Sequence, residues 1–138
     1  MIGRISLAYF AGLLFAIAAH AQSFDGVYRG QITTTVCASP ERGPKGRACA
    51  VGNSLPTEFR VQNSVIRVKN RGNEWSAPVR SDGSFDIRGR FHSLVGQGGL
   101  VNQQWQGVIK GSRIDGTQTA TGRGGHQQHT FTATRQAR

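Results

Sequence analysis

The chain has 138 residues, of which 17 are Lys or Arg and 7 are Asp or Glu, so its formal net charge is +10. This length is enough for one domain with one modest core, and the sequence has no internal repeat that would indicate a second domain. A charge of this size governs solubility and attraction to polyanions, and it excludes no fold class.

The N-terminal segment has the three parts of a secretory signal peptide. Arg4 supplies a positive charge, residues 5–19 are uncharged and mostly apolar, and Ala19-His20-Ala21 forms an A-x-A cleavage site. The apolar run is shorter than the roughly 20 residues that a membrane-spanning helix needs. We therefore expect residues 1–21 to be a cleaved signal helix, and residues 22–138 to form one periplasmic or secreted domain with no membrane span. Loss of Arg4 lowers the net charge by one, from +10 to +9.

The chain has two cysteines, Cys37 and Cys49. In an oxidising compartment, an isolated pair in a small domain is most simply a disulfide. It would close a loop rich in proline and glycine, within the segment from Ala38 to Pro56, and stabilise the fold by roughly 2–4 kcal/mol. A zinc or redox site would need further ligands or a C-x-x-C spacing. We expect a structural disulfide and no metal or other cofactor.

Beyond the leader, the hydrophobic pattern has a period of two, which is typical of antiparallel strands. Eight strands are predicted, over residues 24–36, 58–62, 64–69, 74–79, 85–91, 101–110, 113–121 and 129–135. Tight turns are expected at Gln62-Asn63 and, with type II′ geometry, at Gly111-Ser112. Ser81-Asp82-Gly83-Ser84 is expected to be a type I′ hairpin turn, and residues 122–126 a last loop.

A meander of eight short strands must close on itself or curl strongly to protect its two edges. The predicted fold is therefore all-β, a small antiparallel up-and-down barrel or half-barrel, in preference to a two-sheet sandwich.

The alternation also predicts which side chains face the interior of this barrel. The candidates for lining a ligand site are Tyr28, Phe85, Phe91, Trp105 and Phe131. Gln103 shares the inward face of its strand with Trp105. Two interpretations stay open: the aromatic side chains fill a small core, or they line a ligand cavity that is open at one end.

Basic side chains alternate along two of the predicted strands. Arg67, Lys69 and Arg71 share one face, and Arg88 and Arg90 alternate with apolar neighbours. These five residues are candidates for contact with a polyanion, which could be nucleic acid, an acidic polysaccharide or anionic lipid head groups. The alternative is that the charge only keeps an exported protein dispersed.

No arrangement of residues indicates an active site. His126 and His129 are three apart, so on a strand they would face opposite sides, and we expect them to be exposed in a loop. Asp82 and Asp86 lack the arrangement of an acid–base pair, and no nucleotide-binding or nucleophile motif is present. A small hydrolase stays a less favoured alternative, which a cleft joining His92, His126 and an acid would support.

Several motifs together resemble a known group of proteins. They are the opening Phe24-Asp25-Gly26-Val27-Tyr28-Arg29-Gly30, the cysteine pair, Ser81-Asp82-Gly83-Ser84-Phe85, and Trp105-x-Gly107-x-Ile109-x-Gly111-x-x-Ile114-x-Gly116. This set resembles small exported bacterial proteins of unassigned function with a lipocalin-like, or calycin-like, β-barrel. In lipocalin-like domains a glycine-x-aromatic motif opens the first strand, and here tyrosine stands in place of the usual tryptophan. The resemblance implies a fold and carries over no catalytic residue.

These observations predict an exported, non-enzymatic binding module for an apolar small ligand or an envelope component. The alternatives are a basic surface protein that binds a polyanion and an uncharacterised small hydrolase.

Overall fold

The computed structural model describes residues 23–38, 50–70, 72–92, 99–122 and 125–138, and each regular element in them is a strand. The strands are β1 (Gly26–Ala38), β2 (Ser54–Gln62), β3 (Val65–Asn70), β4 (Asn73–Pro78), β5 (Ser84–His92), β6 (Leu100–Lys110), β7 (Arg113–Gly122) and β8 (Gly125–Arg135). These residues include no helix long and apolar enough to cross a membrane. The predicted signal peptide, Cys49 and Arg71 lie outside the described residues, so the signal peptide and the disulfide stay predictions.

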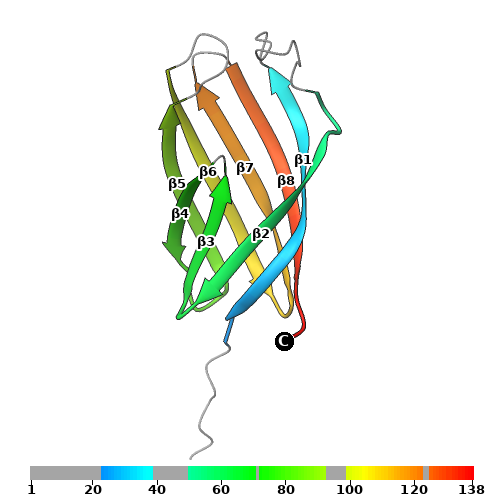
Figure 1. The fold of residues 1–138 in the computed structure, drawn as a ribbon, viewed down its shortest axis with the longest axis vertical. Helices are drawn as coiled ribbons and strands as arrows, with labels where there is room; N and C mark the ends of the chain where they lie inside the picture. The colour runs from blue at the N-terminus through cyan, green and yellow to red at the C-terminus, as the bar shows by residue number, and fades with distance from the viewer. Residues whose placement is uncertain (1–22, 39–49, 71, 93–98, 123–124) are drawn as a thin grey trace, which may run out of the picture.

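The strands form one antiparallel sheet in the order β4-β3-β2-β1-β8-β7-β6-β5 (Figure 1). Strand β1 pairs with both β2 and β8, so the first and last strands lie side by side in the middle of this order. The sheet curls until its edge strands, β4 and β5, are in contact along a seam. The prediction of an all-β up-and-down barrel is confirmed, with a sheet that is nearly closed.

The side chain of Trp75 separates the two edges of the seam. Its indole lies on the backbone of Gly89 in β5, where an added Cβ atom would overlap it, and its ring centroid is 6.2 Å from that of Phe91. The segment from Ser81 to Ser84 does reverse the chain, with hydrogen bonds from the Gly83 N–H to the Arg80 oxygen and from the Arg80 N–H to the Ser84 oxygen, both at 2.9 Å. The pairing ends there, because β4 and β5 are not hydrogen-bonded neighbours, and the predicted type I′ geometry is wrong. Within that segment only Gly83 has a positive φ, and a type I′ turn needs two such residues.

Three further differences from the predicted elements arise from strand pairing. β2 begins at Ser54, inside the predicted loop from Ala38 to Pro56, because Leu55 and Pro56 pair with β1. β8 begins at Gly125, within the predicted last loop, because Gly125 pairs with Gly122 of β7. The turn between β2 and β3 lies one residue later than predicted, at Asn63-Ser64, because Gln62 pairs with Val65. Both turn residues have positive φ, 52° and 59°, which is type I′ geometry.

Ser64 holds a left-handed conformation that glycine adopts more readily. We expect Ser64→Gly to raise the free energy of unfolding by about 0.5–1 kcal/mol, because Asn-Gly is a preferred type I′ pair and an L side chain is strained there. Urea denaturation followed by circular dichroism measures the change. Ser112→Gly is the matched control: Ser112 follows Gly111 in a two-residue turn but its φ is not positive, so glycine there should lower stability. A gain at Ser112 without one at Ser64 would contradict the explanation.

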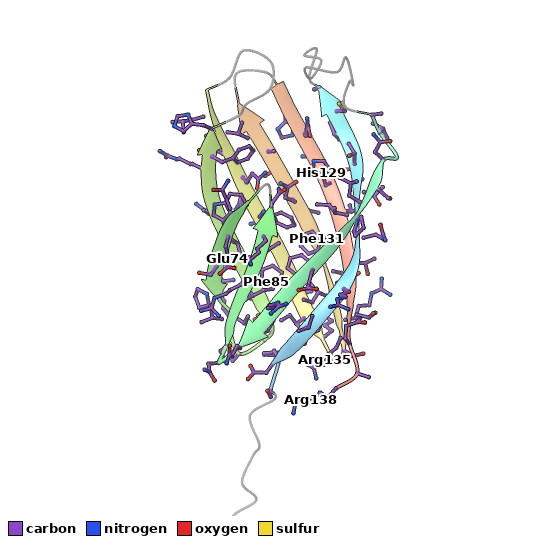
Figure 2. The ribbon with its side chains drawn as sticks, in the orientation of Figure 1. Glu74, Phe85, His129, Phe131, Arg135 and Arg138 are labelled. Atoms are coloured by element: carbon purple, nitrogen blue, oxygen red, sulfur yellow. The ribbon has the colours of Figure 1, made fainter. Side chains whose placement is uncertain are left out.

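Aromatic and branched side chains fill the core of the barrel, and Figure 2 shows two of them, Phe85 and Phe131, between Arg135 at the lower end and His129. Phe59 lies at its centre, with ring centroids 5.0 Å from Phe131, 5.8 Å from Trp105 and 6.4 Å from Phe85. An eight-stranded barrel has an interior just wide enough for side chains to fill, and these rings fill it here. The largest fully buried side chains are Tyr28, Phe59, Phe85, Ile66, Ile87, Ile109, Ile114 and Val68.

A hydrogen-bonded group closes the lower end of the barrel. The Tyr28 hydroxyl donates to the backbone oxygen of Phe24 at 2.7 Å and accepts from Nε and Nη2 of Arg135, at 3.0 and 2.6 Å. The Arg135 guanidinium also lies 5.3 Å from the centroid of the Tyr28 ring, within cation–π distance. This group joins the start of β1 to the end of β8, so any site inside the barrel must lie higher up.

Candidate ligand site inside the barrel

The five aromatic side chains predicted to line the interior all face inward, and each is at most 9% exposed. They do not form one ring. Phe85, Trp105 and Phe131 surround Phe59, and we call these four rings the aromatic cluster. Tyr28 belongs to the hydrogen-bonded group at the lower end of the barrel, and Phe91 packs against Trp75 at the seam.

A row of aligned side chains on the inner wall starts at Trp105 of the aromatic cluster and continues with three polar residues. The backbone register aligns Thr34 of β1 with His129 of β8, His129 with Gln118 of β7, and Gln118 with Trp105 of β6. Thr34 and Gln118 are buried, and His129 is half-buried. Figure 2 shows His129 above Phe131, toward the upper end of the barrel. We call Thr34, His129, Gln118 and Trp105 the polar row.

Two buried atoms of the polar row have no hydrogen-bond partner among the described residues. They are Nε1 of Trp105, which is a donor, and Oε1 of Gln118, which is an acceptor. Both side chains are only 2% exposed, so solvent at the surface does not satisfy these atoms. A buried polar group without a partner costs about 1–3 kcal/mol. A bound group that both accepts and donates would recover this free energy.

The short β3–β4 hairpin covers only part of the height of the barrel. Its strands have six residues each, and Figure 1 shows the hairpin ending partway up the barrel. Asn70, the last residue of β3, reaches across the interior and its Nδ2 donates to Oε1 of Gln103 at 3.4 Å, which is a long bond. Gln103 is buried beside Trp105, whereas Val101 and Gln127 higher up are partly exposed. The interior therefore changes from sealed and apolar below the row to polar and partly accessible above it.

The histidines do not lie in a loop as the sequence predicted, because strand β8 begins before them. His129 faces inward, where its Nδ1 is 3.1 Å from Oγ1 of Thr34, and His126 is 3.0 Å from Oγ1 of Thr121. His92 ends β5 and is exposed. The structure does not bring His92 and His126 together with an acid, and the described residues contain no cluster of His, Cys, Asp or Glu that could hold a metal ion.

The described carboxylates of the strands lie on the outer wall, in contact with arginines. Hydrogen bonds from Arg29 and Arg60 hold the pKa of Glu58 below its usual value. A hydrogen bond from Arg113 likewise lowers the pKa of Asp115. These groups are ionised at neutral pH and face away from the polar row, so the interior receives no acid–base group from them.

The predicted polyanion contacts lie elsewhere, on the outer wall beside the seam. Those that the structure describes are Arg67, Lys69, Arg88 and Arg90, on strands β3 and β5. A shallow outer hollow of about 390 Å³ lies beside Arg88 and Arg90, and another of about 530 Å³ lies at Arg29 and Glu58.

The site residues that sequence reasoning missed are Thr34, Gln118 and His129. Gln118 sits at an inward position of its strand, four residues after Ile114, so a glutamine in an apolar pattern was a usable signal. His129 begins the predicted strand 129–135 two residues before the inward Phe131, so the alternation also placed it on the inward face, and the expectation of exposed loop histidines was wrong for it.

Comparisons with protein-family models, curated proteins and solved structures found no match for this chain. Its function must therefore be argued from the site itself.

Proposed function

We propose that this chain is an exported, non-enzymatic binding module that holds a small ligand at the polar row. The observation that carries the proposal is the pair of unsatisfied buried atoms, Trp105 Nε1 and Gln118 Oε1. Ligand sites are mostly apolar, with a few polar groups that orient the ligand, and this pair lies at the edge of the aromatic cluster, to which the Trp105 ring itself belongs.

The two atoms define the chemistry of the ligand. Trp105 and Gln118 are cross-strand partners on the inner wall, so their side chains are neighbours. Because the Trp105 indole donates and the Gln118 oxygen accepts, a ligand that satisfies both must offer an acceptor and a donor. A single hydroxyl group on an apolar body supplies both. The apolar small ligand expected from the sequence thus becomes an aromatic or alicyclic molecule with one polar group.

A water molecule could also satisfy the two atoms, because water donates and accepts. Water and an organic ligand can be distinguished by whether an aromatic ring contributes to binding. If only water binds, an aromatic alcohol gains nothing over water. If the row is a ligand site, the alcohol binds and the same ring without its hydroxyl binds less well.

The test uses the two tryptophans of the chain, Trp75 and Trp105. In the Trp75→Phe variant the fluorescence comes from Trp105 alone, which is at the site. Titration with benzyl alcohol should change this fluorescence at about millimolar concentration, as expected for a fragment of this size, and toluene should bind at least about tenfold more weakly. Equal responses to the two compounds, or no response to either, would refute the proposed site. Native mass spectrometry of protein from its own source should then identify the natural ligand.

A further inference from the structure

The outer wall on the seam side of the barrel carries a concentration of cationic side chains. It comprises Arg60 of β2, Arg67 and Lys69 of β3, and Arg88 and Arg90 of β5, and we call these five residues the basic wall. All five are exposed. They lie on the opposite side of the sheet from the polar row, so the two surfaces are independent.

Two arginines of the basic wall are direct cross-strand partners. Arg60 of β2 is aligned with Arg67 of β3, and both side chains point outward. Side chains opposite each other have Cβ atoms about 4.5–5.5 Å apart, and like charges at this distance destabilise a sheet. Arg60 contacts Glu58, and Arg67 lies 3.8 Å from Glu74. No described carboxylate therefore bridges the two arginines. An external anion would relieve the repulsion.

The seam brings the cations of β3 and β5 onto one surface. Strand β4 pairs with β3, and Trp75 of β4 packs on Gly89, the residue between Arg88 and Arg90. Arg88 pairs with Asp86 at 3.2 Å, whereas Arg90 has no ion pair with a described carboxylate. The sequence separates these residues by about twenty positions, and the curl of the sheet brings β3 and β5 to the same side of the barrel, with β4 between them.

The hollow beside Arg88 and Arg90 extends the basic wall with uncharged polar groups. Its other lining side chains include Asn102, Gln104, Thr119 and Thr121 on β6 and β7. Amides and hydroxyls both donate and accept hydrogen bonds, which suits the hydroxyls of a sugar. Arginine forks suit carboxylates and other anions of similar geometry.

We propose that the basic wall binds an acidic polysaccharide, with anionic groups at the arginines and sugar hydroxyls in the adjoining hollow. Nucleic acid fits less well, because single strands are held by aromatic platforms as well as by charge. The aromatic side chains of the described strands are buried or half-buried and face the interior. A polysaccharide needs no such platform.

Heparin, an acidic polysaccharide, is the probe for this proposal. The full mature protein and two double variants are compared on a heparin column and by titration at several salt concentrations. The first variant, Arg60→Gln with Arg67→Gln, removes the facing arginine pair of the basic wall. The matched control, Lys110→Gln with Arg113→Gln, removes the same charge from another cross-strand cationic pair, at the turn between β6 and β7.

The wall variant should bind heparin about tenfold more weakly at low salt, since exposed ion pairs are individually weak. Its slope of log affinity against log salt should also fall by about two, one for each lost contact. The control should keep the affinity and slope of the wild type to within about twofold. Both variants should unfold within a few degrees of the wild type, because each loses a like-charge pair and also exposed ion pairs that are worth little individually.

Equal losses in both variants would overturn the proposal, because binding would then follow net charge and not the basic wall. Absence of wild-type binding, or of any loss in the wall variant, would overturn it as well. A thymidine oligonucleotide and phosphatidylserine vesicles complete the test. If either binds as tightly as heparin and with the same dependence on Arg60 and Arg67, a polysaccharide is the wrong partner.

Discussion

Replacing Phe59 with alanine should lower the free energy of unfolding by about 3–5 kcal/mol, which is a large part of the total stability of a domain of this size. Phe59 is completely buried, and its ring contacts Phe85, Trp105 and Phe131, which come from three other strands. Its removal leaves a void where the aromatic cluster is held together. The surrounding rings are fixed to separate strands and can collapse into the void only in part.

Urea denaturation followed by circular dichroism and by tryptophan fluorescence measures this loss. Phe59→Leu keeps most of the volume and should cost much less than the alanine variant. Leu55→Ala is the matched control on the same strand, because Leu55 is 66% exposed and should change stability by no more than about 0.5 kcal/mol. If Phe59→Ala cost no more than this control, the aromatic cluster would not be the core of the barrel.

Replacing Gln118 with leucine should abolish the preference for benzyl alcohol over toluene while leaving the protein folded. Gln118 Oε1 is buried without a described partner, and leucine of similar size removes this unsatisfied acceptor. We expect stability to stay within about 1 kcal/mol of the wild type, or to rise, because an unsatisfied buried polar group is unfavourable. The proposed ligand hydroxyl, in contrast, loses the acceptor for its proton.

The readout is the ratio of the two dissociation constants, measured by Trp105 fluorescence in the Trp75→Phe background. It should fall from at least about tenfold to about one in Gln118→Leu. Gln128→Leu is the control, because Gln128 is exposed on β8, and its ratio should stay at the wild-type value. A preference that persists in Gln118→Leu would show that the hydroxyl binds elsewhere.

Each strand could be predicted from local alternation, because a strand with one buried face repeats every two residues. That alternation predicted that Phe85, Trp105 and Phe131 face inward, and all three are buried. Strand ends were less predictable. β8 begins at Gly125 only because β7 is long enough to pair with it, and the neighbouring glycines gave a local pattern typical of a loop.

Ser81-Asp82-Gly83-Ser84 illustrates the limit of local patterns. The Asp-Gly pair is a strong hairpin signal, and the strands on either side have the right alternation. The chain does reverse there, and Arg80 and Ser84 are hydrogen-bonded across the turn. Beyond them Trp75 lies between the strands, and each strand pairs with a different neighbour. Trp75, whose side chain prevents pairing, lies several residues before the turn. Gly89, on which it packs, lies several residues after the turn.

The sequence by itself determined the fold class, the inward or outward direction of most side chains and the excess of basic charge. The first two properties depend on neighbours within a few residues, and the charge depends on composition alone. Only the tertiary structure decided which side chains meet, because register between strands depends on long-range pairing. It aligned Thr34, His129, Gln118 and Trp105 from four strands, and it set Arg60 opposite Arg67. Both proposed binding surfaces come from that register.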